Sequence, residues 1–260
     1  MARAAVATAA VAGNAALYEY FRQAWWSGPR ARHLWINWET HEPFREQDKF
    51  GHAWGGYHLT RVGAGLLRSV CVSDRKSELW GAAYAGLFQL QIELWDGTQQ
   101  EYGFSPPDLA ADVTGAIFAV EQSRHPTLQA LKPTISWAST AAYRNRAAHG
   151  GNPRATVDYS GQTYWVSVDM KQLLPDDVAD YWPGIVRLSV GHSITDYVDP
   201  ATGAGEWAHR KFVVSLDLDP SRLPGDFPVW RTVKRELSYY HFPAPALVLT
   251  PTLRGVKWYR

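Results

Sequence analysis

Ionisable side chains interrupt otherwise apolar stretches in the first half of the chain, and their types could bind protons or a cation. Asp48, Lys49 and His52 open one stretch, and on a helix Asp48 and His52 lie one turn apart on the same face. Glu93 and Asp96 lie three residues apart at the end of the next stretch, directly before a glycine. These two groups supply one imidazole, one ammonium and several carboxylates.

A third polar group marks the start of the following predicted helix. Ser105 is a good N-cap, and Pro106 fits the first helical position, where its missing N–H costs nothing. Asp108 falls at the third helical position, which is close to a capping box, and Asp112 lies one turn further on. This helix therefore begins with two carboxylates on one face.

Buried charges are costly unless they are paired. We therefore expect the imidazole and ammonium of the first group to meet the carboxylates of the other two groups where the helices converge. Such a cluster could be a structural network that fixes helix register, a site for a ligand or lipid headgroup, or a hydrolytic or metal site, because an imidazole with carboxylates can hold a divalent cation. The chain has no H-E-x-x-H, no G-x-S-x-G and no phosphate-binding glycine loop. We predict no catalytic residue, no metal and no cofactor.

Four helices are expected to carry these groups, over residues 4–26, 48–70, 75–95 and 105–121. The second and third contain many glycines, each of which costs roughly 1 kcal/mol relative to alanine in a helix interior. That cost is consistent with helices that cross at close range. These glycines are Gly51, Gly55, Gly56, Gly63, Gly65, Gly81 and Gly86.

The second half of the chain shows the period-two alternation of half-buried strands over residues 163–170, 187–194 and 212–219. A turn signal at 199–203 predicts a hairpin between the last two strands. The prolines at 243 and 245 predict an extended tail over 241–247. The expected fold is α+β, with a four-helix membrane-associated bundle over 1–132 and a small antiparallel, strand-rich and aromatic region over 133–260.

The amino-acid composition limits the classes of partner that the protein is expected to bind. The formal net charge of +1 argues against nucleic acid, which needs a concentrated basic field. The single cysteine, Cys71, excludes an internal disulfide and is expected to be a small buried hydrophobe. The 13 Trp and 13 Tyr favour interfaces with a membrane or a partner protein.

Support for membrane association is weak. No segment supplies the roughly 18 consecutive apolar residues of a spanning helix, and the mean hydropathy is −0.30. The apolar run over residues 4–18 predicts an anchoring or amphipathic first helix rather than a removed signal peptide.

The same polar segments resemble the YfiM-like family of predicted bacterial envelope lipoproteins, which has no known function. The likeness rests on D-K-F-G-H-A-W-G-G-Y at 48–57, E-L-W-D-G at 93–97 and G-F-S-P-P-D-L-A-A-D-V-T-G-A at 103–116, with weaker pieces in the second half. The helical part is more distantly similar to VanZ-like membrane proteins, although Asp112 stands where that pattern usually has asparagine. The lipobox cysteine of the lipoprotein members is missing. The resemblance implies an envelope location and a four-helix unit, without a reaction.

The leading hypothesis is a non-catalytic, membrane-associated protein of the bacterial envelope, whose polar cluster serves structure or ligand binding. Its expected partners are membrane lipid and other membrane proteins. One alternative is an accessory subunit of a larger membrane complex of respiratory or photosynthetic type. Another is a hydrolase-like enzyme that acts on a lipid or cell-wall precursor. The candidate residues are Asp48, Lys49, His52, Glu93, Asp96, Ser105, Asp108 and Asp112.

Overall fold

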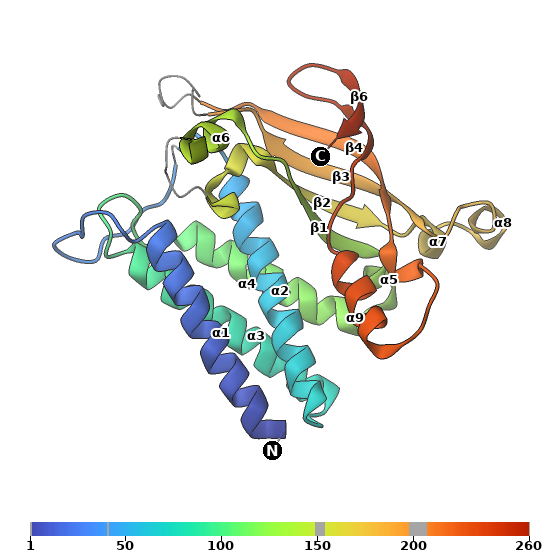
Figure 1. The fold of residues 1–260 in the computed structure, drawn as a ribbon, viewed down its shortest axis with the longest axis horizontal. Helices are drawn as coiled ribbons and strands as arrows, with labels where there is room; N and C mark the ends of the chain where they lie inside the picture. The colour runs from blue at the N-terminus through green and yellow to red at the C-terminus, as the bar shows by residue number, and fades with distance from the viewer. Residues whose placement is uncertain (1, 41, 149–153, 198–206, 260) are drawn as a thin grey trace. The chain divides into compact units, whose positions relative to one another are not determined.

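The computed structural model describes residues 2–40, 42–148, 154–197 and 207–259 (Figure 1). Helices occupy the N-terminal half and an antiparallel sheet occupies the C-terminal half, which confirms the predicted α+β class. The chain forms two compact units. A helical unit comprises residues 1–41 and 48–124, and a sheet unit comprises residues 42–47 and 125–260.

The helical unit contains four long helices, and all four were predicted to within three residues at each end. They are α1 (Ala2–Ala24), α2 (Gln47–Ser69), α3 (Asp74–Asp96) and α4 (Pro106–Arg124). Within the described part of the chain, none of them combines the length and the hydropathy that crossing a membrane requires. The predicted membrane-associated character of this unit is therefore not confirmed.

Several glycines lie where two helix backbones almost touch. A Cβ atom added at Gly56 of α2 would overlap the backbone of α4, and one added at Gly115 of α4 would overlap the carbonyl oxygen of Ala53 in α2. At Gly81 of α3, an added Cβ would lie 2.6 Å from the carbonyl oxygen of Thr60 in α2. Close crossing thus explains part of the predicted glycine set and brings the polar ends of α2, α3 and α4 together.

The prediction of a buried Cys71 was wrong. Cys71 follows the end of α2 in a left-handed conformation, with φ of 64°, and its side chain is exposed. Its backbone N–H donates to the carbonyl oxygen of Arg68, which closes the helix end. A residue in this capping position points away from the apolar face of the helix. The apolar run that precedes Cys71 was therefore a misleading guide to its burial.

The sheet unit contains six strands in sequential order, each antiparallel to the next. They are β1 (Leu131–Trp137), β2 (Gln162–Val168), β3 (Val186–Ile194), β4 (Arg210–Leu218), β5 (Ala244–Val248) and β6 (Arg254–Tyr259). The predicted strands correspond to β2, β3 and β4, and the predicted extended tail contains β5. The hairpin pairing of β3 with β4 is confirmed. The predicted turn at 199–203 lies outside the described residues.

Shorter helices connect or flank these strands. They are α5 (Pro126–Gln129), α6 (Ala141–Ala148), α7 (Met170–Leu173), α8 (Asp176–Ala179) and α9 (Pro228–Leu237). Helix α9 ends just before Ser238, whose carbonyl oxygen accepts a hydrogen bond from the buried Arg187 of β3. This bond joins the end of α9 to the polar side of the sheet.

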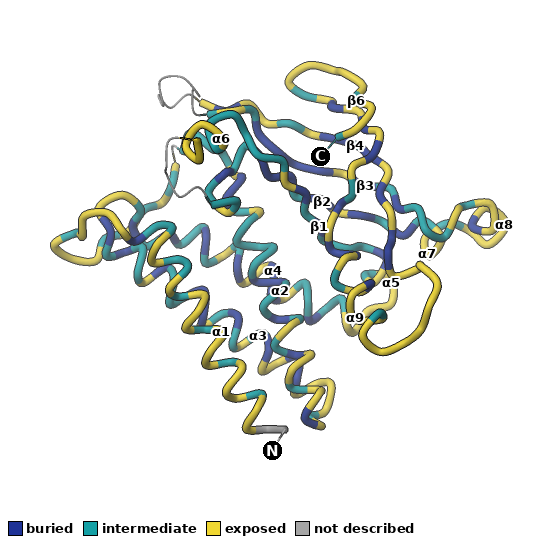
Figure 2. Tube along the Cα trace, viewed as in Figure 1, coloured by how far each residue is buried: buried dark blue, intermediate teal, exposed yellow. Residues whose placement is uncertain are grey.

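The two faces of the sheet have opposite character (Figure 2). The buried face carries the core cluster of Trp165, Val213, Ala246 and Val248. Beside it runs a hydrogen-bonded row of Thr134, Ser167 and Ser189 on β1, β2 and β3. The opposite face is apolar and partly exposed, and cross-strand pairs keep it continuous over the sheet. Its exposed members are Val166, Val190, Phe212, Leu216, Leu218 and Leu247.

Candidate functional site: a histidine among buried carboxylates

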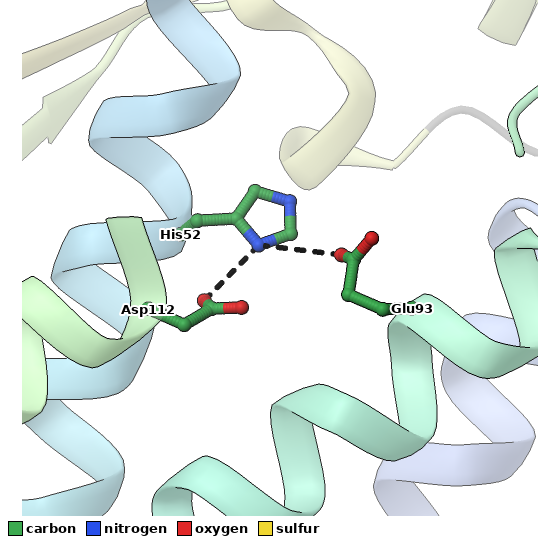
Figure 3. Close-up of side chains that lie close together, drawn as sticks. All are labelled: His52, Glu93 and Asp112. Atoms are coloured by element: carbon green, nitrogen blue, oxygen red, sulfur yellow. Dashed lines mark hydrogen bonds and ion pairs between the residues drawn. The ribbon is translucent and has the colours of Figure 1, made fainter. Parts of the chain in front are cut away.

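His52 of α2 lies between carboxylates from two other helices of the same unit (Figure 3). Its Nδ1 atom is 3.1 Å from Oδ1 of Asp112 in α4 and 3.9 Å from Oε1 of Glu93 in α3. Its Nε2 atom is 3.7 Å from Oδ2 of Asp108 in α4. The imidazole is half-buried, whereas Asp112 and Glu93 are each only 1% exposed. Three helices therefore contribute to one polar group.

Lys49, one turn before His52, neutralises a second set of carboxylates. Its Nζ atom is 2.7 Å from Oδ1 of Asp108 and 2.8 Å from Oδ2 of Asp48, and it also pairs with Glu39. Asp108 thus faces both the ammonium of Lys49 and the imidazole of His52, and it joins the two sets into one cluster.

Ser105 serves as the predicted cap of α4. Its Oγ atom accepts a hydrogen bond from the backbone N–H of Asp108 at 3.1 Å. The expected capping box is completed differently, because the backbone N–H of Ser105 donates to Oε2 of Glu93 at 2.9 Å rather than to Asp108. The bond to Glu93 joins α3 to the start of α4. The Asp108 carboxylate is then free to pair with Lys49 and His52.

Asp96 lies at the edge of the cluster. Its Oδ1 atom accepts a hydrogen bond of 2.5 Å from Nε1 of Trp26, so its closest partner is an indole rather than a cluster cation. The structure therefore brings together seven of the eight predicted residues through direct contacts with one another. Asp96 contributes through its charge and through its place on α3, three residues after Glu93.

Sequence reasoning missed three residues of the site. Glu39 pairs with Lys49 from a loop, Trp26 binds Asp96, and Gln89 of α3 donates from Nε2 to Oδ1 of Asp112. Gln89 lies one helical turn before Glu93, so the four-residue spacing could have identified it. Glu39 and Trp26 lie outside the helices of the cluster, where spacing carries no such information.

Burial and mutual repulsion shift the pKa values of the cluster. Burial by itself lowers the pKa of His52. The surrounding carboxylates, first that of Asp108, raise it by more than burial lowers it, and the resulting pKa is about 10. Burial raises the pKa of Glu93 to about 8 and that of Asp96 to about 7. Burial, together with the charge of Asp108, raises the pKa of Asp48 to about 8. Burial thus favours the protonated form of these carboxyl groups, and the carboxylates around His52 favour the protonated imidazole.

The arrangement can do two things chemically. It can bind protons that a cation would displace, because burial favours the protonated form of the carboxyl groups and the neighbouring carboxylates favour that of His52. It can also offer ligand atoms to a cation, since two sets of three groups place one ligand atom each within 4.8 Å of one another. The first set is His52, Glu93 and Asp112, and the second is Glu39, Asp48 and Asp108.

Comparison with models of protein families places part of the chain beside a described family. Residues 35–123, about a third of the chain, match the model of a family described as "Predicted periplasmic lipoprotein (DUF2279)". This stretch contains α2, α3, most of α4 and all of the cluster except Trp26. The match supports the predicted resemblance to an uncharacterised family of bacterial envelope lipoproteins. The resemblance to VanZ-like proteins stays a prediction. No curated protein and no solved structure matches the chain.

Proposed function

We propose that the protein is a non-catalytic component of the bacterial envelope whose helical unit binds a ligand at the His52 cluster. The match of residues 35–123 to a family of predicted periplasmic lipoproteins supports the location. One observation carries the ligand-binding role. A half-buried imidazole lies among carboxylates from two further helices, and two oxygens of those carboxylates, Oε1 of Glu93 and Oδ2 of Asp112, accept no hydrogen bond from any described residue.

A purely structural network would satisfy its buried oxygens, because each unsatisfied group costs free energy. A binding site leaves such oxygens without a donor until its ligand binds, and the ligand-free protein is less stable as a result. The one hydroxyl predicted in the cluster, that of Ser105, is occupied in capping α4. The site therefore offers ligand atoms and protons rather than an obvious nucleophile.

Neutralising the site is expected to leave the fold intact. The combined variant His52→Gln, Glu93→Gln and Asp112→Asn should unfold in urea within about 1 kcal/mol of the wild type, or be more stable, because replacing a whole buried charged group is often neutral. A loss of more than about 3 kcal/mol would favour the structural network instead. Fractionation of cells that express the full chain is expected to place it with the envelope, and recovery only in the cytosol would contradict the location.

The sheet unit supports a second candidate, an accessory subunit of a larger membrane complex. Its partly exposed apolar face carries Val190, Leu216 and Leu247 on adjacent strands, and an uncharged patch of this kind suits contact with lipid or with another membrane protein. Extraction in mild detergent should then recover the chain with a stable partner. Purification without detergent as a monodisperse monomer would contradict this candidate.

A further inference from the structure

We infer that His52, Glu93 and Asp112 form a binding site for a divalent transition-metal ion of the zinc type. This inference rests on the proposed ligand-binding role of the cluster and names the chemical class of the ligand. The three side chains come from α2, α3 and α4, and Figure 3 shows both carboxylates directed toward the same ring nitrogen of His52.

The spacing of the ligand atoms suits such an ion. Zinc binds imidazole nitrogen and carboxylate oxygen at about 2.0–2.2 Å, so tetrahedral ligands lie about 3.4 Å from one another. The distances from Nδ1 of His52, 3.1 Å to Oδ1 of Asp112 and 3.9 Å to Oε1 of Glu93, fall on either side of that value. Shifts of a few tenths of an ångström would complete three ligand positions.

The carboxylates also keep oxygens available. Glu93 is 1% exposed, yet its Oε1, the atom that lies 3.9 Å from Nδ1 of His52, accepts no hydrogen bond from the described residues. The second oxygen of Asp112, Oδ2, also lacks a donor, whereas its Oδ1 already accepts from Gln89. A buried carboxylate oxygen without a donor is costly, and a cation supplies what is missing. This observation is independent of the clustering itself, and it points to an occupant with positive charge.

Surrounding groups hold these ligands in place. The backbone N–H of Ser105 binds the other oxygen of Glu93, Oε2, and the amide of Gln89 binds Oδ1 of Asp112. On the far side of the ring, Nε2 of His52 is 3.7 Å from Oδ2 of Asp108. At this distance the Asp108 carboxylate acts on the second ring nitrogen through its charge, on the side of the ring away from the two ligand oxygens.

The neighbouring set of acidic residues does not need a metal. Glu39, Asp48 and Asp108 also converge, but the ammonium of Lys49 pairs with all three. A protein cation thus already occupies that position. In the His52 set, by contrast, Glu93 and Asp112 form their ion pairs with the imidazole of His52 itself, whose ring nitrogen is one of the three ligand atoms.

The donor atoms select the class of ion. Magnesium and calcium prefer oxygen ligands and six or more of them, whereas imidazole favours zinc and its neighbours in the first transition row. With one nitrogen and two carboxylates, the site leaves a coordination position for water. Zn²⁺ is therefore the appropriate probe, and Mg²⁺ and Ca²⁺ are the comparison ions.

The test is calorimetric titration of the full chain, stripped of metal by a chelator, with Zn²⁺. We expect a single saturable site, a higher melting temperature with Zn²⁺, and little response to Mg²⁺ or Ca²⁺. Glu93→Gln and Asp112→Asn preserve side-chain size and should each weaken binding at least about 100-fold, since loss of an outer partner alone typically costs 10–100-fold. Gln89→Ala, which removes such a partner, should weaken binding about 10–100-fold.

Two matched variants locate the ion. Asp96→Asn removes a nearby carboxylate of α3 that binds Trp26, and it should leave the Zn²⁺ affinity within about threefold of the wild type. Asp48→Asn removes a carboxylate of the Lys49 set and should weaken Zn²⁺ binding less than Glu93→Gln does. If Asp48→Asn abolished binding while Glu93→Gln did not, the ion would lie in the other set and the inference would be wrong.

A measurement on the wild type covers the case in which the triad variants fail to fold. Zn²⁺ should shift the nuclear magnetic resonance signals of the His52 imidazole at stoichiometric addition. Unshifted signals, or no calorimetric and no thermal response to Zn²⁺, would overturn the metal assignment. That negative result would leave the envelope location standing, because fractionation tests it separately. Recovery of the chain from the cytosol would overturn the location and leave the metal result intact.

Discussion

Replacement of Gly115 by alanine is expected to lower the free energy of unfolding of the helical unit by about 3 kcal/mol or more. The added methyl group would overlap the carbonyl oxygen of Ala53 and lie 2.9 Å from the backbone nitrogen of Tyr57, both in α2. Backbone atoms of a packed helix cannot move aside as a flexible side chain can, so α2 and α4 must separate. Separation would also pull Asp112 away from His52.

Urea unfolding followed by circular dichroism measures this effect, and Gly86→Ala is the matched control. Gly86 also lies inside a long helix, α3, but no atom lies within 4 Å of the position of an added Cβ. Alanine there should raise the stability by up to about 1 kcal/mol through helix propensity. Equal effects of the two substitutions would mean that α2 and α4 do not cross closely at Gly115.

Removal of Asp217 is expected to destabilise the sheet unit by about 3–5 kcal/mol. Its Oδ2 atom accepts hydrogen bonds of 2.8 Å from Arg187 and 2.9 Å from Ser167, on the buried face of the sheet. Arg187 is 2% exposed, so the Asp217→Ala variant would leave a guanidinium charge with little access to water. The remaining partners of Arg187 are two backbone carbonyls and, at 4.0 Å, the carboxylate of Asp219, which lies farther away than that of Asp217.

Two comparisons distinguish the destabilisation caused by an unpaired buried charge from that caused by the loss of an exposed ion pair. Asp226 pairs with Arg231 at 3.6 Å with both side chains exposed, so Asp226→Ala should change stability by less than about 1 kcal/mol. The double variant Arg187→Met with Asp217→Leu should be more stable than Asp217→Ala alone, because it removes both members of the buried pair. If the double variant were the less stable of the two, the pair would contribute through its own attraction.

Helix periodicity and capping chemistry predicted much of the helical unit. Ser105 and Pro106 fixed the start of α4. The four-residue spacing of Asp48 with His52 and of Asp108 with Asp112 placed each pair on the side of its helix that faces the cluster. The cost of unpaired buried charge then required the helices to converge. These are local rules and one strong energetic constraint, and both are readable from a single sequence.

The sheet was harder to predict. Strand β1 contains Pro133 and a short mixed pattern, and β6 is a largely exposed edge strand, so neither shows a clear alternation. Period two identified β2, β3 and β4 but could not decide which face is buried. Period two would allow Val166 and Val190 to be buried, whereas the structure buries the side that carries Ser167 and Ser189. That side also holds the buried Trp165 and Val213 and the Arg187–Asp217 pair. Such long-range pairing is invisible to local patterns.

The most direct test of the central claim is the titration of the His52 imidazole in the metal-free protein, followed by nuclear magnetic resonance. The signal is assigned by its loss in His52→Gln. Because Asp108, Asp112 and Glu93 surround the ring, its pKa should lie near 10, so the imidazole should stay protonated through neutral pH. A titration midpoint near the ordinary value of about 6.5 would mean that the carboxylates do not surround His52 and that the cluster does not exist.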